Sequence, residues 1–286
     1  MLSPVDVVTF SFGKSREKSL LGKMLIAGEH WIYRKADALI FTKEGDTDYL
    51  KEKGWTTAQG GDIDLAKCNY INNGVNLLAY KSQIETEVYE DEDLLLDNKF
   101  NIVYAGTIRP VNNVGNLLDC AKILKGKDGY EDVQFLIFGD GSELEPLRKR
   151  ACDESLDNVK LKGFVPRKYM PYILSKSSVN ILNYSQNEYN WTRGNSSNKL
   201  FEYMASGKPI ISTVKMGYSI INKYNCGVEL DECSPECLAD AIIRFHDMPK
   251  EECYNLGVNA YEGAKDFDFD VLTQKLVAVI ESVTKK

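Results

Sequence analysis

The stretch "FNIVYAGTIRPVNNVGNLLDCAKILKG" at residues 100–126 decides the fold predicted for this chain. Its first part, "FNIVYAG", is a short apolar run that ends at a glycine, which is typical of a buried strand. Its last part, "NVGNLLDCAKILKG", has the length and the apolar spacing of an amphipathic helix. The stretch therefore predicts one strand-loop-helix unit of an α/β protein.

The same unit recurs along the rest of the chain. Strand-like runs, each followed by a stretch of helical length, lie at "VQFLIFGDG" (133–141), "NVKLKGFV" (158–165), "SVNILNY" (178–184), "KPIISTV" (208–214) and "CGVEL" (226–230). Regular alternation with nearly continuous apolar strands indicates a parallel sheet that is covered by helices on both faces. We expect one complete doubly wound, Rossmann-like α/β domain over residues 98–266.

Residues 1–97 carry a weaker α/β pattern, with strands expected at "ADALIFT" (36–42) and "CNYINNGVNL" (68–77). Two such units are too few for an independent Rossmann-like domain, so we expect a partial α/β segment and a hinge. The acidic run "ETEVYEDEDLLLDN" (85–98) predicts a solvated connection, and the domain boundary is placed there. Residues 267–286 predict an amphipathic C-terminal helix whose apolar stripe packs on protein rather than on a membrane.

Composition narrows the class of protein. The net charge of -7 argues against a nucleic-acid partner, and no apolar run approaches the roughly 18 residues of a membrane span. The N-terminus lacks the pattern of a signal peptide, so a cytoplasmic location is expected. Seven scattered cysteines predict reduced thiols rather than a disulfide framework, and two histidines give little support to a zinc site or a catalytic triad.

The segment "SSNKLFEYMASGKP" (196–209) places a lysine at the start of a predicted helix. Ser196, Ser197 or Asn198 is expected to cap the first amides. A helix N-terminus carries partial positive charge, so Lys199 there costs about 0.3–1 kcal/mol unless an anion joins it. Two interpretations stay open: Lys199 pairs with Glu202 on a solvated face, or the two side chains contact two parts of one ligand.

Two loops that follow predicted strands are candidates for ligand binding, because ligands of open parallel sheets lie beyond the carboxyl ends of the strands. "AGTIRPVNNVG" (105–115) offers Arg109 and nearby amides, which suit a diphosphate, although a turn with an exposed arginine also explains it. "GDGSELEPL" (139–147) lacks the third glycine of a dinucleotide fingerprint. Ser142 and Glu145 there predict a capping box, and a close approach of the loop backbone to a ligand stays open.

The order of "YAGTIR", "FLIFGDGSELEPL", "NVKLKGFVPRKYMPYIL", "SSNKLFEYMASGKPII" and "CGVELDECSPECLADAI" resembles the donor-binding domain of family-four glycosyltransferases of the GT-B fold. The chain looks most like the bacterial members that build capsular and other surface polysaccharides. The resemblance covers about residues 98–262 and continues weakly upstream. It implies sugar transfer from a nucleotide-diphosphate sugar with retention of configuration, and it implies neither a metal nor a cofactor beyond that co-substrate.

The resemblance also implies which residues bind the donor. Glu202 would bind the ribose hydroxyls, residues 197–200 and the first loop would meet the diphosphate and sugar, and the backbone at 164–165 would read the nucleobase. The implied donor-binding residues are Gly106, Thr107, Arg109, Asn113, Phe164, Val165, Ser197, Asn198, Lys199, Leu200 and Glu202. No catalytic residue is assigned.

The sequence departs from the family pattern in three places. Gly194 stands where a first glutamate often contacts the donor sugar, asparagines replace a lysine of the first loop, and most of the N-terminal acceptor domain is missing. We therefore expect a glycosyltransferase, or its donor half, that uses a UDP- or GDP-sugar and a glycan or lipid-linked acceptor, in the cytoplasm or at the inner membrane face. The alternatives are a catalytically incomplete nucleotide-sugar-binding subunit that needs a partner chain supplying the N-terminal domain, and a sugar-nucleotide epimerase.

Overall fold

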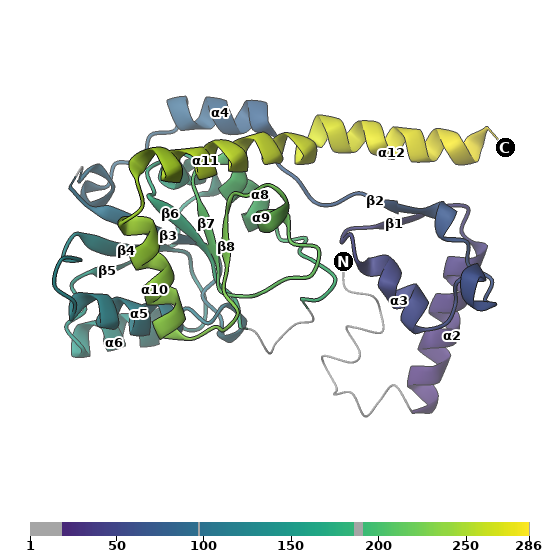
Figure 1. The fold of residues 1–286 in the computed structure, drawn as a ribbon, viewed down its shortest axis with the longest axis horizontal. Coiled ribbons are helices and arrows are strands. Elements are labelled where there is room, and N and C mark those ends of the chain that lie inside the picture. The colour runs from purple at the N-terminus through teal and green to yellow at the C-terminus, as the bar shows by residue number, and fades with distance from the viewer. Residues whose placement is uncertain (1–18, 97, 186–190, 286) are drawn as a thin grey trace. The chain divides into compact units, whose positions relative to one another are not determined.

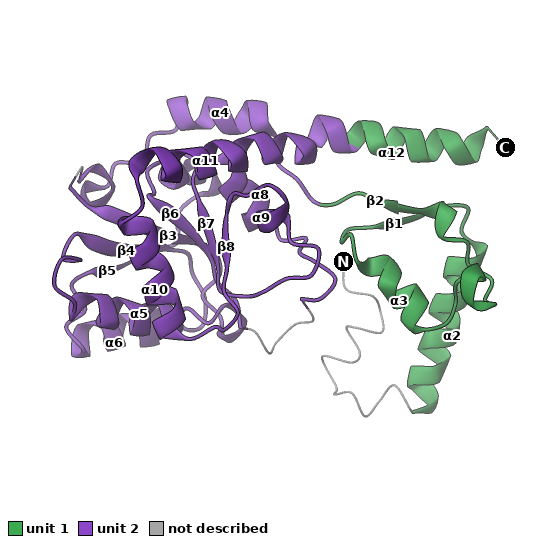
Figure 2. Cartoon of the chain, viewed as in Figure 1, with its two compact units in different colours: residues 1–72, 273–286 green, residues 73–272 purple. Residues whose placement is uncertain are grey.

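The computed structural model describes residues 19–96, 98–185 and 191–285 and divides the chain into two compact units (Figure 2). The smaller unit comprises residues 1–72 and 273–286, and the larger unit comprises residues 73–272. Residues 1–18, 97, 186–190 and 286, which include parts of the predicted domains and of the loop after 184, lie outside the described residues.

A six-stranded parallel sheet forms the centre of the larger unit, in the order β5-β4-β3-β6-β7-β8 (Figure 1). Its strands are β3 (Phe100–Ala105), β4 (Val133–Phe138), β5 (Val159–Gly163), β6 (Val179–Leu182), β7 (Ile210–Ser212) and β8 (Gly227–Glu229). The chain starts in the middle at β3, runs outward to β5, and then returns to β6 on the other side of β3. This is the strand order of Rossmann folds, which confirms the predicted doubly wound α/β architecture.

Helices connect the strands of this sheet, and two more helices follow its last strand. The connecting helices are α5 (Gly115–Lys125), α6 (Leu144–Asp153), α7 (Met170–Ser175), α8 (Asn198–Ala205) and α9 (Ile220–Lys223), and the two that follow β8 are α10 (Pro235–His246) and α11 (Lys250–Ala264). Helix α5 packs against α10, and α8 packs against α11. Single turns of 3-10 helix lie at Thr57–Gln59, Leu65–Lys67, Glu92–Leu95, Pro110–Asn112, Arg167–Tyr169 and Lys265–Phe267.

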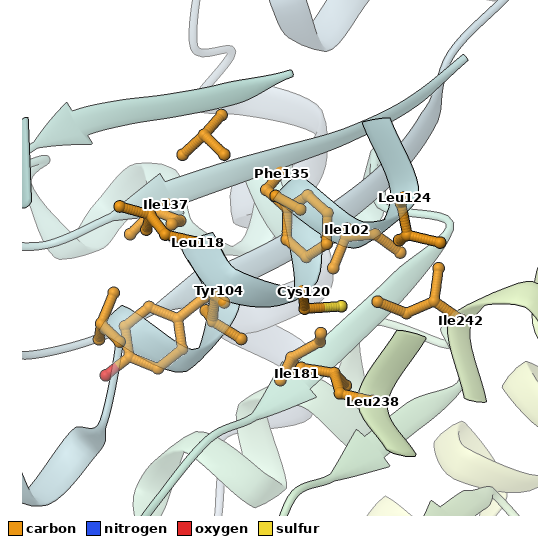
Figure 3. Packing of buried hydrophobic residues seen from close by; sticks show 14 of the residues in the cluster. Ile102, Tyr104, Leu118, Cys120, Leu124, Phe135, Ile137, Ile181, Leu238 and Ile242 are labelled. Atoms are coloured by element: carbon orange, nitrogen blue, oxygen red, sulfur yellow. The ribbon is translucent and has the colours of Figure 1, made fainter. Parts of the chain in front are cut away.

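The main hydrophobic core lies between the sheet and helices α5 and α10 (Figure 3). Phe135 and Ile137 of β4 contribute to it from the sheet, and Leu118 and Leu124 of α5 and Ile242 of α10 contribute from the helices. All five side chains are fully buried. Burying a large apolar side chain stabilises a fold by about 1.5–3 kcal/mol, so this interface accounts for the continuous apolar run of β4, whose six residues are all buried.

Most described residues of the acidic run at 85–98 are exposed, as the sequence predicted, but the run belongs to the larger unit and does not separate the two units. Helix α4 (Leu77–Thr86), which the sequence analysis did not identify, packs on α7, and Leu94 beyond it is 4% exposed. The Lys162 Nζ of β5 lies 2.7 Å from Asp91 Oδ1 and 2.5 Å from Asp93 Oδ2, so the acidic residues pair with the sheet. The two units accordingly divide at residues 72 and 73, before α4, instead of within the acidic run.

The predicted capping box of Ser142 and Glu145 is also wrong. Helix α6 begins at Leu144 with Glu143 at its N-cap, and Glu145 instead accepts a hydrogen bond from Arg148 at 2.7 Å. The Glu143 amide donates to the carbonyl of Ile108 at 3.1 Å. The loop after β3 therefore holds the turn that precedes α6, and the helix starts too late for Ser142 to cap it.

The smaller unit contains α2 (Leu20–Lys35), β1 (Leu39–Phe41), α3 (Asp46–Glu52) and β2 (Cys68–Tyr70), and β1 pairs with β2 in parallel. Leu50 and Ile63, both fully buried, lie in its core. Buried Glu29 accepts hydrogen bonds from the hydroxyls of Tyr33 and Tyr49. The predicted C-terminal helix is present as α12 (Phe269–Thr284), whose residues from Thr273 onward belong to this unit.

Candidate donor site

The candidate site lies at the point where the strand order reverses, between β3 and β6. Adjacent parallel strands whose connections leave in opposite directions create a crevice beyond their carboxyl ends, where ligands of this architecture bind. The loop after β3 begins at Gly106, and the chain after β6 continues through Asn183 and Tyr184. The N-terminus of α8 comes to the same place, because the Lys199 side chain lies against Gly106.

Lys199 is the central cation of this crevice. Its Nζ lies 3.0 Å from the Tyr104 hydroxyl, and it lies over the rings of Tyr104 and Tyr184 at 4.7 and 5.2 Å from their centroids. A Cβ on Gly106 would lie 2.3 Å from this nitrogen, so the amine occupies space that only a glycine leaves open. Burial lowers the pKa of Lys199 to about 8, although the charge of Glu202 acts in the opposite direction.

The pairing of Lys199 with Glu202 on a solvated face is not what the structure contains. Glu202 pairs with Arg167, whose Nη2 lies 2.6 Å and whose Nε lies 3.2 Å from Oε1. Among the described residues no carboxylate lies within ion-pair distance of Lys199. Of the two interpretations that the sequence left open, the surface ion pair is therefore wrong, and the amine is held by aromatic rings instead of by an acid.

The start of α8 differs in detail from the prediction. Ser197 occupies the N-cap position, but its hydroxyl makes no bond to the first helical turn within the described part of the chain. It lies 2.7 Å from the Tyr184 hydroxyl instead, and its amide donates to Asn195 Oδ1. Asn198 is exposed, whereas Leu200 is fully buried and its amide donates to the Ser197 carbonyl at 3.1 Å.

The loop after β3 is fixed at both of its ends. The Asn183 Nδ2 donates to the carbonyls of Asn112 and Asn113 at 2.6 and 2.9 Å, which ties the loop to the end of β6. Asn113 adopts a left-handed conformation with φ of 47°. Thr107 and Arg109 of the same loop are exposed, so their side chains are accessible from solvent at the edge of the crevice.

Two glycines of the "GDGS" loop have a structural role in the same region. A Cβ on Gly139 would lie 1.7 Å from the Gly106 carbonyl oxygen, and one on Gly141 would lie 2.2 Å from that of Ile108. The Gly106 amide donates to Phe138 and the Ile108 amide donates to Asp140, both at 2.9 Å. The two loops thus continue the sheet past its last residues, and this close packing of backbones explains the glycines.

The Glu202 carboxylate lies beside a second hollow of the larger unit. A cavity of about 310 Å³ is lined by Glu202, Arg167, Tyr80 of α4 and neighbouring residues. Phe164, which is 73% exposed, and Val165, which is buried, precede Arg167 in the segment after β5. The sequence analysis missed Arg167 and Tyr80. Only the position of Arg167 two residues after Val165 could have indicated its role, and Tyr80 gave no signal before α4 was known.

The structure thus brings together some of the predicted residues and separates others. Gly106, Asn113, Ser197 and Lys199 gather around the end of β3, and Tyr104 and Tyr184 join them without having been predicted. Glu202 lies one turn along α8 and contacts the segment after β5. Which of these residues touch a ligand stays a prediction.

Searches with the sequence and the structure place the chain among known proteins. The sequence profile described as "Glycosyl transferases group 1" matches residues 86–263, more than half of the chain. None of the curated proteins matches the chain significantly in sequence. No helix among the described residues is long and apolar enough to cross a membrane.

Several solved structures share the fold. Anabaena Alr3699/HepE in complex with UDP is similar with a TM-score of 0.70 and 17% identity, over 94% of this chain and 70% of that one. The complex of the same protein with UDP and glucose has a TM-score of 0.67 and 17% identity, over 91% of this chain and 66% of that one. Sucrose-phosphate synthase from Thermosynechococcus elongatus has a TM-score of 0.68 and 16% identity, over 100% of this chain and 66% of that one.

These likenesses agree with the α/β fold of the chain. The chain spans about two thirds of the length of the structures that it resembles. Because the sequence profile covers more than half of the chain, the chain belongs to the group 1 family of glycosyl transferases.

Proposed function

We propose that this chain binds a nucleotide-diphosphate sugar at the crevice between β3 and β6 and takes part in transfer of the sugar with retention of configuration. The observation that carries the proposal is Lys199, a partly buried cation at the mouth of α8. Its charge is held without a carboxylate in the described structure, and a helix N-terminus favours an anion at the same place. A diphosphate would satisfy both.

The expected chemistry follows from where charge develops. As the bond between the sugar and the β-phosphate breaks, negative charge builds on the leaving phosphate, and fixed donors in a dry cleft stabilise it. Lys199, Arg109 and the amides of Asn198 and Lys199 at the start of α8 would supply these donors, so we propose that no metal ion is needed. Gly106, Thr107 and Asn113 would shape the loop that receives the diphosphate.

Glu202 is the proposed ligand of the ribose. Both hydrogen bonds from Arg167 reach its Oε1. We propose that Oε2, with or without displacement of Arg167, accepts hydrogen bonds from the ribose hydroxyls. The backbone of Phe164 and Val165 would read the nucleobase in this arrangement, since both precede Arg167 in the same segment.

A uridine nucleotide is the first donor to test, because the similar structure of Anabaena HepE was solved with UDP and with UDP-glucose. The acceptor is proposed to be a glycan or a lipid-linked glycan of a surface polysaccharide, reached from the cytoplasm or the inner membrane face. A catalytically incomplete subunit that binds the donor and needs a partner chain is the second candidate, because the chain spans only about two thirds of its structural neighbours.

Calorimetric titration of the purified chain with UDP and GDP tests the donor site. We expect one nucleotide to bind, and we expect Lys199→Ala and Glu202→Ala each to weaken it by about tenfold or more, as the loss of one charge-assisted contact predicts. Lys127→Ala, at an exposed lysine two residues after the C-terminal end of α5, is the matched control. Absence of binding by both nucleotides would refute the donor site, whereas binding without sugar transfer to any acceptor would favour the incomplete subunit.

A further inference from the structure

A second cavity opens at the opposite edge of the sheet from the candidate donor site. It measures about 580 Å³, which is within the usual range of small-molecule sites. Its walls come from residues at the amino-terminal ends of β3, β6 and β7 and from the start of α11. The cavity therefore shares no lining residue with the crevice beyond the carboxyl ends of the strands.

Lysines dominate the charge of this cavity. We define the lysine pocket by the four that line it, Lys99, Lys176, Lys208 and Lys250. No aspartate or glutamate is among its described lining residues, although acidic residues outnumber basic ones in the chain by 42 to 35. Ser178 also lines the cavity, and its hydroxyl accepts from the Asn101 amide, whereas the hydroxyl of neighbouring Ser177 is buried and donates to the Leu174 carbonyl. A concentration of positive charge in an acidic protein is the opposite of what composition predicts.

The tertiary structure holds the lysine pocket in place. Gly207 has a φ of 65° and ends the turn after α8, and a Cβ on Gly257 of α11 would lie 2.2 Å from its carbonyl oxygen. Helix α11 thus packs directly on this turn, and this contact brings the start of α11 beside Lys208. The backbone that carries Lys208 and the start of α11 is therefore held in place by direct packing.

None of the four lysines is paired with an anion among the described residues. Neither Lys208 nor Lys250 makes a hydrogen bond or ion pair with any described residue, and the contact of Lys176 is with the ring of Tyr172 at 5.1 Å. Burial, with the nearby charge of Lys176, lowers the pKa of Lys208. Lys250 is the first residue of α11, where the helix dipole disfavours a cation. Lys99 donates to the neutral backbone carbonyl of Glu131 at 2.9 Å.

We propose that the lysine pocket binds a phosphate-bearing anion that carries more than one negative charge. Lysine ammonium groups and hydroxyls are common ligands of phosphate oxygens, and separated cations favour an anion with several charged oxygens. Leu96 and Tyr254, which are 41% and 71% exposed, add apolar surface to the lining of the same cavity. A soluble diphosphate and a phospholipid headgroup share the chemistry that this lining would recognise.

Calorimetry with inorganic pyrophosphate tests the pocket, in a Lys199→Met background that removes the central cation of the candidate donor site. We expect pyrophosphate to bind the Lys199→Met chain. When Lys176→Met and Lys208→Met are introduced together into that chain as a double variant, we expect the affinity for pyrophosphate to fall by at least about tenfold. Methionine retains the length of the apolar stem, and removal of a buried charge should leave the melting temperature unchanged or raised. Lys81→Met with Lys127→Met, two exposed lysines elsewhere in the larger unit, is the charge-matched control.

Flotation with vesicles then distinguishes the two sources of the phosphate group. If phosphatidylcholine vesicles bind the full chain only when phosphatidic acid is added, and the double variant stays unbound, the ligand is a lipid headgroup. If pyrophosphate binds and neither vesicle does, the ligand is a soluble phosphate. Equal pyrophosphate isotherms for the folded double variant and for the charge-matched control would overturn the proposal, as would the absence of pyrophosphate binding in the Lys199→Met background.

Discussion

Replacement of Lys199 by methionine should stabilise the chain while it removes nucleotide binding. Burial lowers the pKa of this amine from 10.5 to about 8, a difference of about 2.5 pKa units. At about 1.36 kcal/mol per unit, the charged form costs about 3 kcal/mol in the folded chain. The two contacts of Lys199 with the tyrosine rings stabilise the charged form by about 0.5–1 kcal/mol each, and its hydrogen bond to the Tyr104 hydroxyl stabilises it by about 1 kcal/mol. The variant should therefore gain up to about 1 kcal/mol in stability.

The pH dependence gives this prediction a second readout. Because the pKa of Lys199 is lower in the folded chain than in the unfolded chain, the charge penalises folding fully below about pH 8. The penalty disappears as the pH rises toward the unfolded value of about 10.5, where both states are neutral. The stability difference between Lys199→Met and the native chain should shrink over that interval.

Differential scanning calorimetry measures both effects. For a unit of this size we expect the melting temperature of the variant to be raised by up to about 2–4 °C at about pH 7, with a smaller rise at about pH 10. Lys127→Met, which removes an exposed charge, should leave the melting temperature unchanged at both values. A variant that melts below the native chain at neutral pH, or a difference that does not change with pH, would show that the reasoning about burial is wrong.

Three further predictions concern the frame of the site and the sheet. Gly139→Ala places a Cβ 1.7 Å from a backbone carbonyl oxygen and should lower the free energy of unfolding, measured by urea denaturation, by at least about 1–3 kcal/mol. Gly126→Ala, whose Cβ would lie 3.6 Å from its nearest neighbour, should not lower it. Equal urea midpoints for the two variants would contradict this reasoning. Tyr203→Phe removes the hydroxyl that bonds both the amide and the carbonyl of buried Ala105 and should cost about 1–3 kcal/mol by the same assay, so an unchanged midpoint would argue against that contact. Burial opposes the charge of His246, but hydrogen bonds to two aspartates raise its pKa. The charged imidazole should therefore stabilise the fold fully below about pH 6.5, and this stabilisation should be lost as the pH rises through the raised pKa. In urea unfolding, the free energies of the native chain and of His246→Gln should differ at low pH and converge at high pH.

Much of the larger unit follows from local sequence. The six strands of its sheet lie where short apolar runs end in glycine or polar loops, because a parallel strand that is covered on both faces must be apolar nearly throughout. The start of α8 near Lys199 was also predicted, because the spacing of its apolar residues indicates a helix with one buried face. Helix α4 escaped prediction because only Tyr80 of its ten residues is buried, which leaves it with little apolar periodicity.

Tertiary structure decided the partners of the side chains at the candidate site. The sequence places Glu202 three residues after Lys199, and a helix makes such residues neighbours, yet Glu202 pairs with Arg167 from another part of the chain. Gly139 and Gly141 suggested a ligand loop by spacing, but their role depends on carbonyls of the loop after β3, which no local pattern encodes. The lysine pocket is the extreme case, because its four lysines are scattered along the sequence between residues 99 and 250.

The sequence by itself therefore determined the elements and their class, since hydrophobic periodicity is a local property of strands and helices. It also marked Lys199 as a cation in an unfavourable place. Only the folded chain decided that this cation lies between Tyr104 and Tyr184 against Gly106, and that lysines remote in sequence meet at the opposite edge of the sheet. The physical reason is that burial and charge depend on distances between segments, which strand order fixes and residue spacing does not.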